Sequence, residues 1–146
     1  MGSTILFVDD ERAILNTFER TLRGSGLEVL TAEDGQSALD ILARQSADIV
    51  ISDMRMPNMD GHQLLRKVKE LFPATIRLIL SGHAEEREIT SAMLDGSSKM
   101  YILKPWDSGM LTKIIRQLLD VRDVLRDRNL LLIINKMDGL CSLPQI

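Results

Sequence analysis

Five residues that could act on a phosphoryl group each stand at the end of a short apolar run. They are Asp9 and Asp10 after Thr4 to Val8, Asp53 shortly after Ile49 to Ile51, Ser81 after Arg77 to Leu80, and Lys104 after Met100 to Leu103. Three carboxylates close together repel one another, so they favour a hard divalent cation with oxygen ligands, and Mg²⁺ fits best. One carboxylate could then attack phosphorus, while the metal, an ammonium and a hydroxyl neutralise the oxygens of the transferring group.

Each of these residues is a weak signal by itself, because an acidic pair is usually a helix cap and a lone lysine is usually a solvated surface group. Together they occupy corresponding positions after four apolar runs. In an open parallel sheet, ligands bind at the carboxyl ends of the strands. If the four runs are neighbouring strands, all five side chains gather at one edge.

The apolar periodicity predicts five strand–helix pairs in strict alternation. Such alternation predicts an α/β fold, a flavodoxin-like (βα)5 three-layer sandwich whose parallel sheet is covered on both faces. Right-handed crossovers leave few topologies, and the strand order 2-1-3-4-5 is the commonest at this size. We expect strands near residues 4–8, 28–32, 49–51, 77–80 and 100–103, and helices near 14–22, 38–42, 60–71, 85–94 and from Asp107 or Ser108 onward.

Composition excludes several other classes of protein. The 146 residues suit one domain with a short extension, and a net charge of −3 argues against a direct nucleic-acid-binding surface. The single cysteine, Cys141, cannot form an internal disulfide, and no Cys/His cluster has metal-ligand spacing. The first residues have no basic segment followed by a long apolar run, so we expect no signal peptide, and no stretch approaches the roughly 18 apolar residues of a membrane helix. We therefore expect a cytoplasmic protein without a membrane partner.

Four motifs resemble the signature of response-regulator receiver domains of two-component signalling. They are Val-Asp-Asp-Glu at 8–11, Ser-Asp-Met-Arg-Met-Pro-Asn-Met-Asp-Gly at 52–61, Ser-Gly-His-Ala at 81–84 and Lys-Pro at 104–105. The similarity runs from about Thr4 to Leu119. It implies a signalling switch, not an enzyme, that takes a phosphoryl group from a sensor histidine kinase or a phosphotransfer protein. The switch would act on an output domain through the face formed by the fourth helix, fifth strand and fifth helix.

The resemblance also implies a role for each site residue. Asp53 would form the aspartyl phosphate, and Asp10, Asp53 and the backbone carbonyl of Arg55 would bind Mg²⁺. Asp9 would act mostly through water. Lys104 would pair with the phosphoryl group, to which Ser81 would donate a hydrogen bond. Tyr101 would turn inward when Ser81 moves, and Arg55 and His83 would set the lifetime of the phosphate, although His83 is equally well read as a solvent-facing helix-start residue. His62 is expected on a helix surface.

Two features depart from the common pattern. Four residues separate Gly96 from Tyr101, one more than is usual in the family, so the loop before the fifth strand is expected to be remodelled and the Tyr101 switch altered. Trp106 follows Lys104-Pro105, and this combination resembles the subgroup often joined to HD-type or ATPase output domains.

The final helix continues beyond the length of a normal fifth helix. Its apolar positions, Leu111, Ile114, Leu118, Val121 and Leu125, repeat at three- and four-residue spacing. We assign residues 1–122 to a receiver domain and 123–146 to an extended signalling helix or linker toward an output domain absent from this chain. The helix would pair in a homodimer; the alternative is a single amphipathic helix folded back on its own domain.

Other functions of the same fold fit the residues less well. A flavodoxin needs a Ser/Thr/Gly-rich phosphate loop after the first strand, where this chain has Asp9-Asp10-Glu11. A phosphatase of the aspartyl-phosphate type needs a second acid two residues after its nucleophile, and that position is Arg55. The remaining alternative is a receiver-like module that binds partners or dimerises without phosphorylation.

Overall fold

The structure is a computed structural model of the chain, and it describes residues 2–81, 86–103 and 106–125. The chain divides into two compact units, Met1–Trp106 and Asp107–Ile146. All the strands and helices α1 to α4 belong to the first unit, and α5 belongs to the second.

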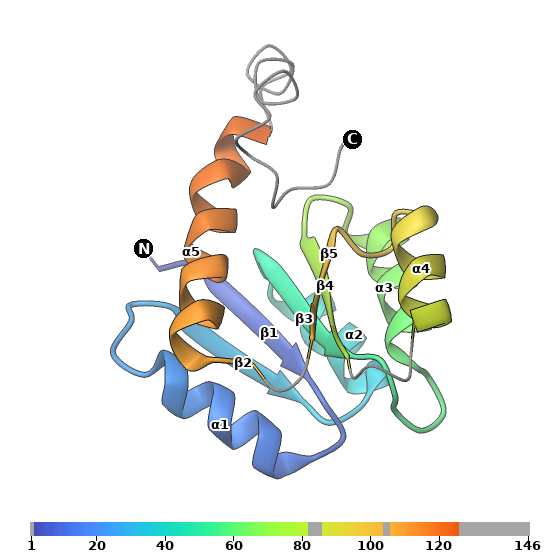
Figure 1. The fold of residues 1–146 in the computed structure, drawn as a ribbon, viewed down its shortest axis with the longest axis horizontal. Helices are drawn as coiled ribbons and strands as arrows, with labels where there is room; N and C mark the ends of the chain where they lie inside the picture. The colour runs from blue at the N-terminus through green and yellow to red at the C-terminus, as the bar shows by residue number, and fades with distance from the viewer. Residues whose placement is uncertain (1, 82–85, 104–105, 126–146) are drawn as a thin grey trace. The chain divides into compact units, whose positions relative to one another are not determined.

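Strands and helices alternate along the first unit as the periodicity predicts, which confirms the α/β fold. The sheet is parallel and has the order β2-β1-β3-β4-β5, which confirms the flavodoxin-like topology (Figure 1). The strands are β1 (Thr4–Val8), β2 (Glu28–Ala32), β3 (Ile49–Asp53), β4 (Ile76–Ser81) and β5 (Met100–Leu103). The helices are α1 (Arg12–Leu22), α2 (Gly35–Arg44), α3 (Gly61–Leu71), α4 (Glu86–Leu94) and α5 (Ser108–Leu125).

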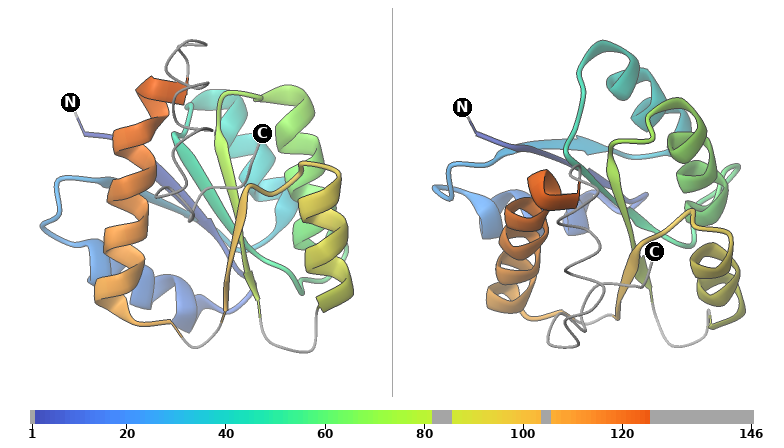
Figure 2. Two further views of the ribbon diagram at one scale, coloured as in Figure 1. Left: turned by 45° about the horizontal axis from the view of Figure 1, so that its top comes forward. Right: turned by 90° about the horizontal axis from the view of Figure 1, so that it is seen from above.

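The central strands carry apolar residues on both faces, as a sheet covered on both sides requires. Leu6 and Val50 point toward α2, α3 and α4, where they share a buried cluster with Leu64 of α3. Phe7 points the other way and stacks on Phe18 of α1 with ring centroids 3.9 Å apart. Figures 1 and 2 show α1 on one face of the sheet and α2, α3 and α4 on the other.

Local signals in the sequence explain where α1 ends and where α3 begins. Gly24 and Gly26 follow α1 with φ angles of 79° and 85°, a left-handed conformation that glycine adopts without steric cost. Asp60 begins α3 with a capping box: its side chain accepts from the Gln63 backbone N–H, and the Gln63 side chain accepts from the Asp60 N–H. The start of α3, directly after the loop from Asp53, is therefore firmly fixed.

The long last helix is confirmed as far as Leu125, where its described part ends. It begins as predicted, with the Asp107 carboxylate accepting from the Met110 backbone N–H at 3.0 Å. Cys141 and most of the predicted signalling extension lie in residues 126–146, outside the described part of the chain, and stay predictions. The division at residue 122 and the homodimer stay predictions too.

Candidate functional site

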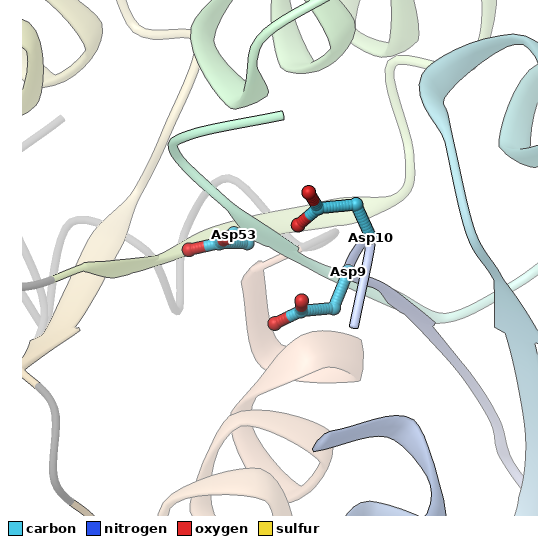
Figure 3. A group of neighbouring side chains, drawn as sticks. All are labelled: Asp9, Asp10 and Asp53. Atoms are coloured by element: carbon cyan, nitrogen blue, oxygen red, sulfur yellow. The ribbon is translucent and has the colours of Figure 1, made fainter. Parts of the chain in front are cut away.

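Three aspartates from two neighbouring strands meet at the carboxyl edge of the sheet. One carboxylate oxygen each from Asp9, Asp10 and Asp53 lies within 4.8 Å of the other two. Figure 3 shows Asp9 and Asp10 just after β1 and Asp53 at the end of β3. Asp9 and Asp53 are only 1% and 7% exposed, whereas Asp10 is exposed to solvent. The cluster thus has two buried acids and one exposed acid, so an ion could reach it from the side of Asp10.

Strand register explains why the acids meet. Val8 pairs with Ser52 in the parallel ladder between β1 and β3, so the next residues along the two strands, Asp9 and Asp53, are neighbours. The Asp9 carboxylate also accepts from the Glu11 backbone N–H at 2.9 Å, which fixes its orientation as the chain turns into α1. The sequence prediction that these three acids come together is consistent with this geometry.

The loop after Asp53 is held close to the strand end. Gly61 donates its backbone N–H to the carbonyl of Met54 at 2.8 Å. A Cβ at Gly61 would collide with the carbonyl oxygen of Asp53, so only glycine allows α3 to begin this close to β3. Asn58 bends the loop with a φ angle of 69°, a conformation that asparagine tolerates better than most residues. The backbone around Asp53 is therefore tightly constrained.

Ser81 and Tyr101 lie on the next two strands. Asp53 pairs with Leu80 of β4, which places Ser81 one residue further along at the same edge of the sheet, fully buried. Tyr101 pairs with Ile79, and its side chain is 46% exposed. Ser81 thus shares the edge with the acids, while Tyr101 lies two residues further back on β5.

Two predicted site residues, Lys104 and His83, lie outside the described residues. Lys104 directly follows Leu103, which is paired with Ser81 in the β4–β5 ladder. Their predicted roles stay predictions.

Arg55, two residues after Asp53, forms an ion pair with Glu88 of α4. The guanidinium Nη2 lies 3.0 Å from the Glu88 carboxylate, and the two side chains are 62% and 38% exposed. The site loop is therefore tied to α4 by a solvent-accessible charge pair. Sequence reasoning did not find Glu88, since the two residues are 33 positions apart.

The donor set suits a small hard cation. Mg²⁺ takes oxygen ligands at about 2.1 Å, so two ligands on opposite sides of it lie about 4.2 Å apart. The spread of 4.8 Å among the three carboxylates is close to that span, and small side-chain rotations close the difference. No sulfur or imidazole ligand joins this group among the described residues, which favours Mg²⁺ over zinc.

A second cluster of polar residues, centred on Asp95, was also not predicted from the sequence. The Asp95 carboxylate lies 2.7 Å from Nε2 of His62 and accepts from the Ser97 backbone N–H at 2.9 Å. Burial opposes ionisation, but hydrogen bonds from Ser97 and His62 hold the pKa of the Asp95 carboxyl well below its usual range. His62, which we expected on the helix surface, has a side chain only 15% exposed and links α3 to the end of α4. The prediction that His62 lies on a helix surface did not include this contact with Asp95.

Comparisons with known proteins agree with the geometry. The family model described as "Response regulator receiver domain" matches residues 5–116. The hydrogenase transcriptional regulatory protein HoxA of Cupriavidus necator is 31% identical over 125 residues, which is 86% of this chain and 26% of that protein. The DNA-binding transcriptional regulator NtrC of Klebsiella pneumoniae is 38% identical over 100 residues, 68% of this chain and 21% of that protein. The chain thus spans about a quarter of the length of these curated relatives.

A solved structure extends the similarity to three dimensions. The signal receiver domain of an HD domain-containing protein from Pseudomonas fluorescens superposes with a TM-score of 0.80 at 32% identity, covering 84% of this chain and 98% of that one. Within the described part of the chain, no helix combines the length and apolar character needed to cross a membrane.

Proposed function

Since the chain belongs to the family of response regulator receiver domains of two-component signalling, we propose that Asp53 accepts a phosphoryl group and thereby switches a partner or output domain. The observation that carries the proposal is the meeting of Asp9, Asp10 and Asp53 within 4.8 Å at two neighbouring strand ends. A receiver domain is a signalling module, and the proposed transfer changes its own state without turning over a substrate.

In the proposed reaction, an Asp53 carboxylate oxygen attacks the phosphorus of a phosphohistidine on a sensor kinase or phosphotransfer protein. A P–O bond to Asp53 forms as the P–N bond to the histidine breaks, and the imidazole nitrogen keeps the bonding electrons and is neutralised by a proton. Burial of Asp53 limits its hydration, so little water would have to be displaced when the donor reaches its carboxylate.

Neighbouring side chains would manage the charge of the phosphoryl group. Asp10, Asp53 and the backbone carbonyl of Arg55 would hold Mg²⁺ directly, with Asp9 acting through water. The bound Mg²⁺ would neutralise the oxygens of the transferring phosphoryl group. Ser81, which is buried at the same edge, would donate its hydroxyl to a phosphoryl oxygen, and Lys104 would supply a positive charge.

The response to phosphorylation would run through β4 and β5. Movement of Ser81 toward the phosphoryl group would open space beside Ile79, and the exposed ring of Tyr101 on the paired strand could turn into it. The face made by α4 and β5 would then change shape for a partner. Arg55 and His83 would govern the access of water to the phosphoryl group and hence its lifetime.

The output and partners are proposed from the relatives. The names of HoxA and NtrC identify transcriptional regulators, and the superposed structure belongs to an HD domain-containing protein. We propose that this chain likewise controls an attached output domain, in a cytoplasmic protein that pairs as a homodimer through its C-terminal helix. Nucleic-acid binding would belong to such an output domain, because this chain carries a net charge of −3.

Phosphoryl uptake can be tested directly. The chain is incubated with Mg²⁺ and acetyl phosphate, and intact mass is measured; the expected result is one added phosphoryl group in the wild type and none in Asp53→Asn. Asp40→Asn, which changes an exposed acid on α2, serves as the matched control and should be modified like the wild type. No adduct on the wild type, or an equal adduct on Asp53→Asn, would refute the proposal and favour a phosphorylation-independent binding module.

A further inference from the structure

Helix α4 packs against the rest of the first unit through few buried apolar side chains. Its buried side chains among the described residues are Ile89 and Ala92, whereas α3 buries Leu64, Leu65 and Val68. Leu94 at its last position is 83% exposed. The free energy gained by burying apolar groups scales with the area removed from water, so packing stabilises α4 less than α3. The position of α4 therefore depends more on its polar contacts.

Those polar links differ between the two ends of α4. At the C-terminal end, the Asp95 carboxylate bonds to His62 and to the Ser97 backbone, and the Asp95 carbonyl accepts from the Lys69 ammonium at 2.6 Å. Nearer the N-terminal end, within the described residues, Glu88 forms its ion pair with Arg55 of the loop after β3. The first group is a network of several bonds, and the second is an exposed pair that joins α4 to the phosphoacceptor loop.

We infer that Glu88 is a positioning residue for Arg55, and that the Arg55–Glu88 pair is the contact through which phosphorylation of Asp53 reaches α4. The inference rests on the proposed function. In the unphosphorylated state, Glu88 holds the Arg55 guanidinium against α4. A phosphoryl group on Asp53 competes for that guanidinium, and the exchange of partner releases α4 from the loop.

The charges favour this exchange. A phosphoryl group carries about −1.5 to −2 charges at neutral pH, against one for the Glu88 carboxylate. Its oxygens also suit the bidentate geometry of a guanidinium. Two residues along the chain span at most about 7 Å, so Arg55 is anchored within reach of a group on Asp53. An exposed ion pair contributes little free energy, so the pair with Glu88 breaks at low cost.

The same competition sets the phosphorylated lifetime. Hydrolysis requires a water to attack phosphorus, so that the P–O bond to Asp53 breaks, inorganic phosphate leaves and the carboxylate is restored. An Arg55 side chain bound to the phosphoryl oxygens obstructs that water. Glu88 draws Arg55 away from this position and therefore shortens the lifetime.

A double-mutant cycle tests the inference. Wild type, Glu88→Gln, Arg55→Met and the double variant are phosphorylated with acetyl phosphate and Mg²⁺, the donor is removed, and loss of the phosphoryl group is followed by intact mass. Glu88→Gln should lose it about two- to fivefold more slowly, a range set by the modest strength of an exposed ion pair. In the Arg55→Met background, Glu88→Gln should change nothing. Glu33→Gln, which breaks the exposed 2.8 Å pair with Arg12, is the matched control and should decay like the wild type.

The outcomes separate the inference from the proposed function. The inference alone is overturned if wild type and Glu88→Gln both take up the phosphoryl group and the variant then loses it at the same rate as the wild type or faster. An equal effect of Glu88→Gln with and without Arg55 would overturn it too, because the effect would then not pass through the pair. Failure of the wild type to take up the phosphoryl group would instead remove the proposed function, and the inference with it.

Discussion

Replacing Asp53 with asparagine should stabilise the metal-free protein, because it removes one of three carboxylates that lie within 4.8 Å of one another. Two unit charges at that separation repel by about 3.5 kcal/mol at an effective dielectric constant of 20. Asp10 is exposed, so water screens its share, and the other contacts of Asp53 offset part of the gain. We expect a net rise of about 1 to 2 kcal/mol in the free energy of unfolding.

Urea denaturation in the presence of a chelator and again with Mg²⁺ measures this effect. In chelator, Asp53→Asn should unfold at a higher urea concentration with an unchanged slope. Mg²⁺ at ten times its dissociation constant should stabilise the wild type by about 1.4 kcal/mol and the variant by much less. The advantage of the variant should therefore shrink or reverse when metal is added. Asp40→Asn, on the exposed side of α2, should stay within about 0.5 kcal/mol of the wild type in both conditions.

Two results would refute the reasoning. If Asp53→Asn is less stable than the wild type in chelator, the native contacts of Asp53 outweigh the repulsion, and the cluster is not a strained, metal-seeking site. If the wild type and the variant gain equally from Mg²⁺, the ion binds elsewhere on the chain.

Two further predictions concern the segment between α4 and β5. Arg77→Met should lower the free energy of unfolding by about 3 kcal/mol in urea denaturation. The buried guanidinium of Arg77 donates to the carbonyls of Ser97 and Thr75 at 2.9 Å and more weakly to those of Gly96 and Pro73. A loss below about 1 kcal/mol would show that water replaces the guanidinium as the donor to these carbonyls. The pKa of the Asp95 carboxyl lies below its ordinary value of 3.8, so its contribution to stability is present above that value and lost as the pH falls further. Stability measured from about pH 5 to pH 3 should thus fall more steeply for the wild type than for Asp95→Asn, and parallel curves would contradict this.

Patterns within short segments were enough to predict the fold and the acid cluster. Residues such as Leu6 and Ile79 lie in runs whose length and flanking turns mark buried strands, and the parallel sheet follows from their alternation with helices. Once the strands are parallel and β1 lies beside β3, Asp9 and Asp53 must meet, because each follows or ends its own strand at the same edge. The position of Ser81 follows in the same way.

Contacts between helices could not be predicted in this way. The partners of Arg55 and His62 are each 33 residues away, and whether they meet depends on how α4 is rotated against α3 and against the loop after β3. That rotation is set by the packing of many side chains and by no local motif. The burial of Arg77 could not be predicted either, since arginine is usually exposed. Its burial is possible because the loop carbonyls surround the guanidinium.

The contrast between the two ends of α4 bears on how a signal would move this helix. Its C-terminal end runs into Gly96 and Ser97, whose carbonyls accept from the buried Arg77, and Asp95 ties the same end to α3. Breaking the bonds of Arg77 would leave a buried guanidinium without partners, which is expensive. The Arg55–Glu88 pair is solvent-exposed, and water can replace either partner at little cost. A charge placed on Asp53 would therefore loosen α4 first at Glu88, while Asp95 and the loop held by Arg77 keep the other end in place.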